Sequence, residues 1–293
     1  MSVSKAFAEH ACYVNGALIH VRSASFSPGL RTAVEVADGE VYATYSSLTA
    51  GAPSFRVTTA DVDAALDAIA VAGTAVSSNT AMWSRAYSGG GSRVAGATAS
   101  HHKILVNAGL CVLRRLSARH GDHATVDFEV IANKSGSTAP VTYSEGVALP
   151  GSTLGADELW TLGSVSLNGA IEGVESVEVD FGVDVLSEAK DSDIYPTFLS
   201  VRRVMPSLRI RSTNIDLTSS LTEDGLSYSA SQVVVTLAKR AEGGTFAGSG
   251  DKTLTMGKCR VDVVSISDDP RRIELLITPI ATAGGSVDPI TVA

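Results

Sequence analysis

Two pairs of histidines in this 293-residue chain are of a type that can bind metal ions. His101 and His102 are adjacent, and His120 and His123 enclose Gly-Asp in the segment HGDH. Imidazole nitrogens are common zinc ligands, but a structural zinc site needs four ligands, usually from two clusters at short and regular spacing. Neither pair has a second cluster at such a spacing, so we predict no metal site.

The segment GSGDKT, which starts at Gly248, contains the glycines and the lysine of a phosphate-binding loop. In such a loop, backbone N–H groups surround the phosphates and a glycine precedes the lysine. Asp251 takes the place of that glycine here, and its carboxylate would repel the phosphates. We therefore interpret the segment as a solvated turn and predict no cofactor.

The three cysteines, Cys12, Cys111 and Cys259, form no CxxC pair. A small, odd number of cysteines is typical of a protein from a reducing compartment without a disulfide framework. Cys111 and Cys259 lie in predicted core strands, where cysteine packs as a small apolar side chain. The sequence also contains no GxSxG or HExxH motif, and we predict that the protein is not an enzyme.

Three carboxylates in the segment VESVEVDFGVDV, which starts at Val174, come closest to a functional site. Apolar and polar side chains alternate along this segment, which predicts one half-buried strand with an acidic face. The acidic members of that face are Glu178, Asp180 and Asp184. Two interpretations remain open at this stage: a simple solvated surface, or a wall whose negative charge has a function.

The composition is that of a folded chain with mostly β structure. Apolar residues make up 44% of the chain and alternate with Ser and Thr in short runs, which favours strands over long helices. The formal net charge of −8 argues against a protein that grips nucleic acid by its phosphates, since that task needs a basic surface. No apolar run has the length of a membrane span, and the amino terminus lacks signal-peptide features, so we expect a soluble protein made in a cytosol.

One pattern occurs twice in the chain. The segment PSFRVTTADVD, which starts at Pro53, returns as PSLRIRSTNID at Pro206, 153 positions later. With the same offset, roughly 15 of the 49 residue pairs that begin at Asn15 and Asn168 are identical. Unrelated segments of this length share about three identical pairs, so we interpret the two segments as copies of one unit.

The later parts of the two copies agree less closely but keep the same order. The strand-like segment VDFEVIA at Val126 resembles RIELLIT at Arg272. We therefore predict two tandem domains of similar fold, residues 1–152 and residues 153–293. Their link is predicted in the glycine-containing stretch PGSTLGAD at Pro150, which has the composition of a linker.

Local patterns predict the order of elements within each copy. Asn15 and Asn168 are each followed by glycine, and Asn-Gly favours a tight turn because both residues tolerate positive φ. In the first copy, a helix is predicted after Thr59, since apolar residues recur at helical spacing from Val62 to Ile69. The corresponding segment of the second copy, STNIDLTSSL, is polar and β-branched, so any helix there is short.

The second copy carries the clearest resemblance to a known family. Between residues 163 and 222, the sequence LNGAIEGVESVEVDFGVDV leads through DSDIYPT to PSLRIRSTNIDL. In this order of an Asn-Gly turn, an alternating strand, an irregular acidic segment and a strand led by proline, the region resembles the tail tube proteins of tailed bacteriophages. Residues 10–69 resemble the same family more faintly.

The resemblance implies a fold class and an assembly. The expected fold is mainly β with minor α, as two tandem duplicated tail-tube-like β-barrel or sandwich domains, each with a hairpin and a flanking helix. Rings of six such domains stack into a hollow tube through which DNA passes. A chain with two domains then implies a trimeric ring with pseudo-sixfold symmetry. A baseplate hub or distal tail protein of the same fold is the alternative.

Partners and location follow from the same resemblance. The implied partners are further copies of the chain and other tail proteins, namely the terminator, the distal tail protein and the tape measure protein. DNA passes through without sticking, and no membrane is involved. The implied location is the tail of the virion, assembled in the cytoplasm of the host bacterium.

The charged residues acquire candidate roles in such a ring. The acidic strand with Glu178, Asp180 and Asp184 is a candidate wall of the lumen, because carboxylates repel the phosphates of DNA. Arg56 and Arg209, which occupy the same place in both copies, are candidates for ion pairs with carboxylates at contacts between domains. Surface arginines without any such role are the alternative.

Two rival classes remain open. A two-domain β-sandwich adhesin or carbohydrate-binding protein would need an exposed aromatic platform, whereas Trp83 and Trp160 are isolated in the sequence. A hydrolase that uses Asp180 and Asp184 ranks third among the hypotheses, and we expect the protein to show no hydrolase activity.

Overall fold

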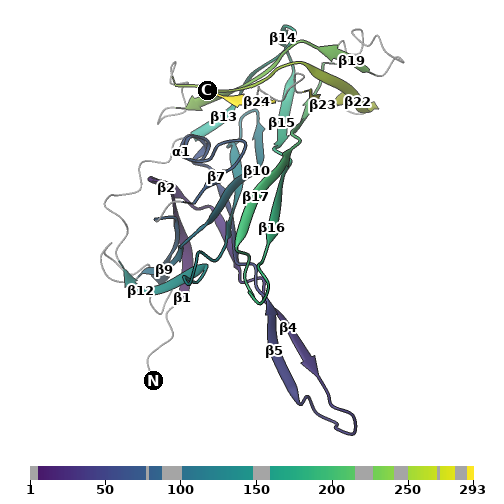
Figure 1. Ribbon diagram of the computed structural model, residues 1–293. Helices are drawn as coiled ribbons and strands as arrows, with labels where there is room; N and C mark the ends of the chain where they lie inside the picture. Colours follow the sequence, from purple (N-terminus) through teal and green to yellow (C-terminus); the bar gives the residue numbers. More distant parts are fainter. Residues whose placement is uncertain are drawn as a thin grey trace.

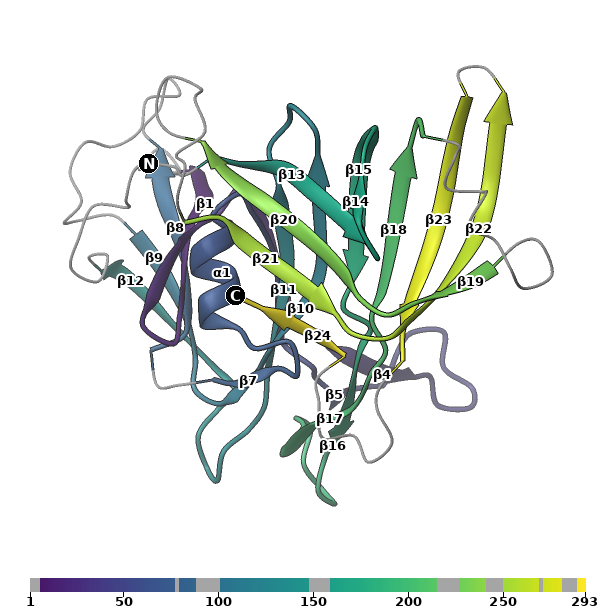
Figure 2. The same cartoon turned by 90° about the horizontal axis from the view of Figure 1, so that it is seen from above.

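The computed structural model describes residues 6–76, 79–87, 101–147, 159–214, 227–240, 250–268, 271–280 and 289–293. Over these residues the fold consists of three larger β-sheets, two separate two-stranded sheets and a single helix (Figures 1 and 2). The prediction of a mainly β fold with minor α is therefore confirmed. The predicted linker PGSTLGAD lies outside the described residues.

Two five-stranded antiparallel sheets each contain a hairpin that is closed by an Asn-Gly turn. Asn15 has φ 48° and Asn168 has φ 55°, as predicted. The first sheet has the order β12-β9-β8-β1-β2, and the second has the order β14-β13-β20-β21-β24. The first contains β1 (Ala6–Val14), β2 (Ala17–His20), β8 (Ala81–Tyr87), β9 (His101–Val106) and β12 (Val141–Val147). The second contains β13 (Leu159–Leu167), β14 (Ala170–Ile171), β20 (Val233–Arg240), β21 (Lys252–Met256) and β24 (Ile290–Val292).

A ten-stranded antiparallel sheet combines strands from both halves of the chain. Its order is β19-β22-β23-β18-β15-β10-β11-β6-β3, and β7 pairs with β10 beside this path. The strands of residues 1–152 are β3 (Ser23–Ser27), β6 (Ser54–Thr59), β7 (Thr74–Ala75), β10 (Gly109–Arg119) and β11 (Thr125–Ala132). The strands of residues 153–293 are β15 (Val174–Asp180), β18 (Ser207–Ser212), β19 (Ser227–Ala230), β22 (Cys259–Asp268) and β23 (Arg271–Pro279).

The two separate two-stranded sheets are hairpins that leave the ten-stranded sheet at equivalent places. One consists of β4 (Arg31–Glu35) and β5 (Tyr45–Ala50), and the other of β16 (Val183–Glu188) and β17 (Phe198–Val204). The β4–β5 hairpin projects away from the rest of the molecule, whereas β16–β17 runs along it (Figure 1).

One hydrophobic core joins all three larger sheets. Buried side chains of the ten-stranded sheet form a single cluster with those of both five-stranded sheets, and β13 contacts both β10 and β15. Figure 2 shows the second five-stranded sheet lying across these strands. The ten-stranded sheet thus buries one face and leaves the other polar, as its alternating strands require.

The helix α1 (Val62–Ala68) packs against β2 and β11. Val62, Ala65 and Leu66 are buried, which confirms the predicted apolar face, although the helix ends before Ile69. Thr59 does not cap it directly: its hydroxyl accepts a hydrogen bond from the backbone N–H of Asp61 at 2.9 Å. The corresponding region of the second half, residues 215–226, lies outside the described residues.

Candidate assembly interface

The histidines do not gather into a metal site. His101 is buried in β9 with its ring edge-on to Trp83, at 6.5 Å between centroids. His102 lies 3.4 Å from a carboxylate oxygen of Glu145. Among the described residues, no group of three or more His, Cys, Asp or Glu side chains could hold a metal ion.

All three cysteines are buried and free. Burial raises the pKa of the Cys111 thiol to about 12 and that of Cys259 to about 11, and it also raises the pKa of Cys12. A thiol reacts as a nucleophile through its thiolate, which burial disfavours here, so these side chains pack as small apolar groups.

Lys252, the lysine of GSGDKT, forms a contact between the two halves of the chain. Its Nζ lies 2.8 Å from Asp63 Oδ1 and 2.7 Å from Asp67 Oδ1, both on α1. Residues 241–249, which include the first two residues of this segment, lie outside the described residues. The described part of the segment thus attaches β21 of the second half to the helix of the first half.

The predicted acidic strand is divided in two, which corrects the sequence prediction. β15 ends at Asp180, and Gly182 then adopts φ +57° with its Cα packed against the backbone of Met205. Only glycine fits there, since an added Cβ would lie 1.9 Å from the Met205 oxygen. Asp184 therefore belongs to the separate β16–β17 hairpin, where it pairs with Arg203 at 3.1 Å. Glu178 and Asp180 remain on β15.

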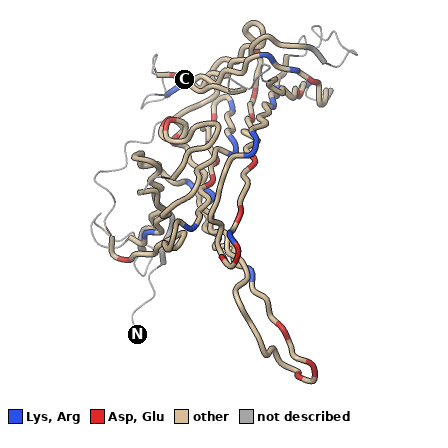
Figure 3. The backbone as a smooth tube through the Cα atoms, in the orientation of Figure 1, with Lys and Arg blue, Asp and Glu red and all other residues tan. Residues whose placement is uncertain are grey.

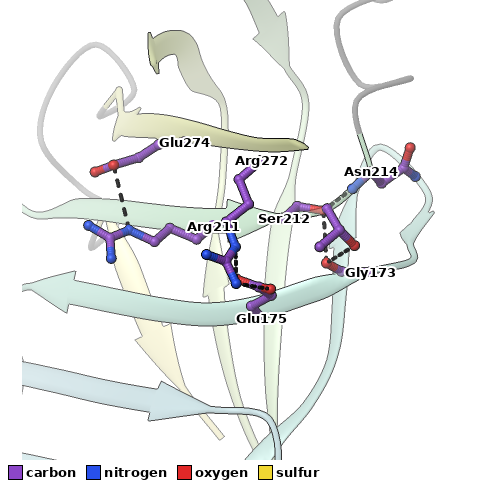
Figure 4. A network of polar contacts seen from close by, with 8 residues as sticks. Gly173, Glu175, Arg211, Ser212, Asn214, Arg272 and Glu274 are labelled. Atoms are coloured by element: carbon purple, nitrogen blue, oxygen red, sulfur yellow. Dashed lines mark hydrogen bonds and ion pairs between the residues drawn. The ribbon is translucent and has the colours of Figure 1, made fainter. Parts of the chain in front are cut away.

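Basic and acidic residues both occur along the strands of the ten-stranded sheet (Figure 3), and ion pairs between them show that its polar face is not an acidic wall. Glu178 pairs with Arg115 at 3.1 Å, and Asp180 accepts a hydrogen bond from the Gly182 N–H at 2.8 Å. The sequence prediction considered the carboxylates of β15 alone and missed the arginines of neighbouring strands. Further ion pairs on this face are Arg272–Glu175 at 2.8 Å and Arg211–Glu274 at 3.5 Å (Figure 4). Arg114 and Glu129 form another pair at 2.7 Å.

Arg56 and Arg209 do pair with carboxylates, but not between the predicted domains. Arg56 Nε lies 3.6 Å from Glu129 Oε1 on β11, and Arg209 Nη1 lies 3.2 Å from Glu274 Oε1 on β23. Each pair stays within its own half of the chain. The two arginines therefore join neighbouring strands of one half, which corrects the predicted position of these contacts for the single chain.

The contact between the halves within this sheet is the antiparallel pairing of β10 with β15. Five residue pairs join these strands, from Arg115 opposite Asp180 to Arg119 opposite Ser176. Leu116 and Val179 are opposite each other on the core side and are fully buried. The Arg115–Glu178 ion pair crosses the same junction on the polar face. Backbone pairing, apolar burial and an ion pair together make the two halves one continuous sheet.

The outer strands of the sheet have edges without a described partner. β3 pairs with β6 on one side, and no described strand pairs with its other side. β22 pairs with β19 only from Cys259 to Asp262, and no described strand continues this pairing along residues 263–268. Strand edges beside which no described strand runs are templates for pairing with another chain.

Comparison with known proteins adds no relative: no protein-family model matches the chain, and no curated protein matches it. Among the described residues, no helix has the length and the apolar character needed to cross a membrane. The function is therefore inferred from the geometry of the chain itself.

Proposed function

We propose that the chain is a structural subunit of a bacteriophage tail tube, in which three copies form a ring of six similar units and the rings stack around a lumen for DNA. The observation that carries this proposal is the matching strand order of the two halves. Read from the opposite end, the second five-stranded sheet has the order β24-β21-β20-β13-β14. Each position then corresponds, in chain order, to one in β12-β9-β8-β1-β2.

The ten-stranded sheet supports the same duplication. In the first half β10, β11, β6 and β3 are neighbours in that order, and in the second half β22, β23, β18 and β15 are neighbours in the same order. Matched units of this kind, joined by β10 and β15, can repeat around an axis from one chain to the next. Closing the sheet into a ring removes every exposed edge, and three chains with two units each give pseudo-sixfold symmetry.

The two hairpins support the duplication at atomic detail. The N–H of Thr44 donates to the carbonyl of Glu35 at 3.0 Å, and the N–H of Thr197 donates to that of Glu188 at 2.9 Å. At the hairpin bases, Gly29 has φ +59° and Gly182 has φ +57°. All of these pairs are 153 positions apart in the sequence.

The polar face of the ten-stranded sheet suits the passage of DNA. Binding of DNA depends on free cationic groups that replace counterions at phosphates. Arg56, Arg115, Arg209 and Arg211 each have a carboxylate within 3.6 Å, so a phosphate would compete with a bound partner. In this proposal the lumen avoids adhesion through paired charges, within a chain of net charge −8.

The proposal is tested on the purified full-length chain by native mass spectrometry and negative-stain electron microscopy over a range of protein concentrations. We expect trimers at intermediate concentration and stacked rings or tubes at high concentration. A monomer under all conditions would contradict the proposal. Single rings that never stack, with or without other tail proteins, would favour the baseplate hub over the tube.

A further inference from the structure

The junction between β10 and β15 has counterparts in β3, at one end of the ten-stranded sheet, and in the part of β22 that extends beyond β19 near the other end. By the correspondence of the halves, β22 takes the place of β10 and β3 takes the place of β15. We propose that β22 of one copy pairs with β3 of the next copy in the register that joins β10 to β15 inside the chain. This inference rests on the proposed function and adds the contact surface and its register.

The offset between β3 and β15 follows from their common neighbours. Ser25 is opposite Arg56 on β6, and Glu178 is opposite Arg209 on β18. Both members of the first pair are 153 positions before their counterparts. Ser25 of β3 therefore takes the place of Glu178 of β15.

The offset between β10 and β22 follows in the same way. β10 has a register shift between Leu113 and Arg115 in its pairing with β11, and β22 has one between Val263 and Ser265 in its pairing with β23. These shifts are 150 positions apart, so Ser267 takes the place of Ser117. Because Ser117 is opposite Glu178, the proposed register follows directly. It places Ser265 opposite Ser27, Ile266 opposite Phe26 and Ser267 opposite Ser25.

Apolar exposure at the edges fits this register. The exposed fraction of Ile266 is 53%, whereas its counterpart Leu116 is fully buried by the internal junction. Likewise 51% of Leu30 is exposed, compared with 4% of its counterpart Val183. Pairing of the edges would cover these side chains as the internal junction covers theirs, which favours association through the hydrophobic effect.

A second copy is the occupant that these edges fit. The two edges carry complementary halves of one junction whose other example is seen within the chain, and both have the required antiparallel direction. Their facing polar positions, Ser25 and Ser267, are small and uncharged, so no charge repulsion opposes the contact. A strand from another protein that adds to either edge is the competing occupant.

The test uses paired cysteines in the full-length chain. The double variant Ser25→Cys with Ser267→Cys places two thiols opposite each other on the polar face of the proposed contact. A disulfide needs Cα atoms about 4.4–6.8 Å apart, as in directly opposite residues, whereas a diagonal offset of two residues is about 7–8 Å. The native cysteines interfere little, since burial raises their pKa values.

Two matched variants serve as controls. Ser117→Cys with Glu178→Cys places the same pair at the internal junction, and it should form a bond within one chain without joining two chains. Ser25→Cys with Ser265→Cys is out of register by two residues. After mild oxidation, denaturing electrophoresis should show covalent dimers and trimers for the in-register pair, at least about tenfold more than for the out-of-register pair.

The outcomes distinguish a failure of the proposed edge contact from a failure of the proposed function. If the unaltered chain forms rings but only the out-of-register pair cross-links, or neither pair does, the inference is overturned and the proposed function stands. If no rings and no cross-links form, both fail. If covalent products continue beyond the trimer, the edge contact is supported and the trimeric ring is wrong. Amide hydrogen exchange of the unaltered chain gives an independent measurement: assembly should slow exchange along both residues 23–27 and residues 263–267. Protection of only one edge would instead indicate a different occupant.

Discussion

The two hairpins have the same internal structure and different surroundings. The connection between β16 and β17 contacts Lys134 of the first half. Lys134 forms an ion pair with Asp193, and its backbone N–H donates to the carbonyl of Pro196 at 2.7 Å. In β4–β5, the residues that correspond to the tip of the other hairpin are exposed: 85% of Val41 and 81% of Tyr42. Their counterparts in the second half are less exposed, as Ile194 shows with 38%.

This difference shows which contacts hold the β16–β17 hairpin in place. The β16–β17 hairpin belongs to the second half and rests on residues of the first half, across the β10–β15 junction. The β4–β5 hairpin would rest in the same way on the second half of a neighbouring copy. Both hairpins have the same internal hydrogen bonds, so the proposed assembly would supply the β4–β5 hairpin, which projects from the single chain (Figure 1), with the support that β16–β17 already has.

Limited proteolysis should show the largest difference between the hairpins. In the monomeric chain, we expect thermolysin, which cleaves before apolar residues, to cleave before Val41 at least about tenfold faster than before Ile194, because local opening of an exposed loop costs little free energy. Mass spectrometry of early fragments measures both sites. Assembly should protect the bond before Val41, and equal cleavage of both sites in the monomer would contradict the comparison.

Glycine-to-alanine substitutions should have different effects on stability at the packed base of β16–β17 and at the exposed tip of β4–β5. Gly182→Ala should lower the free energy of unfolding by roughly 2–4 kcal/mol, through positive φ and the clash with Met205. Gly39 also has positive φ, at +88°, but an added Cβ there would meet nothing within 4 Å. Gly39→Ala should therefore cost only about 1 kcal/mol. Denaturant unfolding of both variants measures the difference, and equal losses would show that the close approach to Met205 has no energetic role.

Lys252 helps to hold the two halves of the chain together through its contacts with Asp63 and Asp67. Burial lowers the pKa of Lys252, but hydrogen bonds to Asp63 and Asp67 and their charges raise it more, so the pKa lies above its ordinary value. A raised pKa in the folded state stabilises the fold below the ordinary lysine pKa of about 10.4, and this contribution is lost as the pH rises through the folded-state pKa.

Lys252→Met should therefore lower the free energy of unfolding by about 1 kcal/mol at pH 7, since both carboxylates are partly exposed and screened. Unfolding measured from pH 7 to pH 11.5 should show the difference from the unaltered chain shrinking at the alkaline end. A constant difference over this range would mean that packing of the lysine stem, and not its charge, connects the halves.

The smallest expected effect concerns the ion pair beneath the second hairpin. A double-mutant cycle on Lys134→Ala and Asp193→Ala should give a coupling energy of about 0.5 kcal/mol. Glu40 occupies the place of Asp193 in the first hairpin, so Glu40→Ala in the monomer is the matched control. A loss of stability in that control equal to the loss in Asp193→Ala would remove the distinction between the two hairpins.

Local structure was predictable from the sequence where neighbouring residues determine it. The turns at Asn15 and Asn168 form as predicted, because Asn-Gly favours positive φ whatever surrounds it. The alternation that starts at Val174 predicts β15 correctly as far as Asp180. It fails at Gly182, because alternation of side chains does not reveal a close approach by the backbone of Met205, and Asp184 consequently lies in another sheet.

The charge of the candidate site was not predictable from one strand. A net charge of −8 does not report which faces carry the carboxylates. Arg115 is 63 positions from Glu178 in the sequence, and only the pairing of β10 with β15 brings the two together. The local sequence pattern indicates which segments form strands, but which strands lie side by side in the sheet depends on the whole fold.

The serines of the proposed contact between copies have a consequence for the rate of assembly. The internal junction joins Arg115 to Glu178, whereas the proposed contact between copies brings together hydroxyl groups at Ser25, Ser27, Ser265 and Ser267. Without long-range attraction between opposite charges, two copies meet at the unsteered rate of about 10⁵–10⁶ M⁻¹s⁻¹. Because each copy has a net charge of −8, added salt should raise the encounter rate modestly by screening the repulsion between copies. In the proposed assembly, the timing of ring formation would then depend mainly on how much of the chain has accumulated.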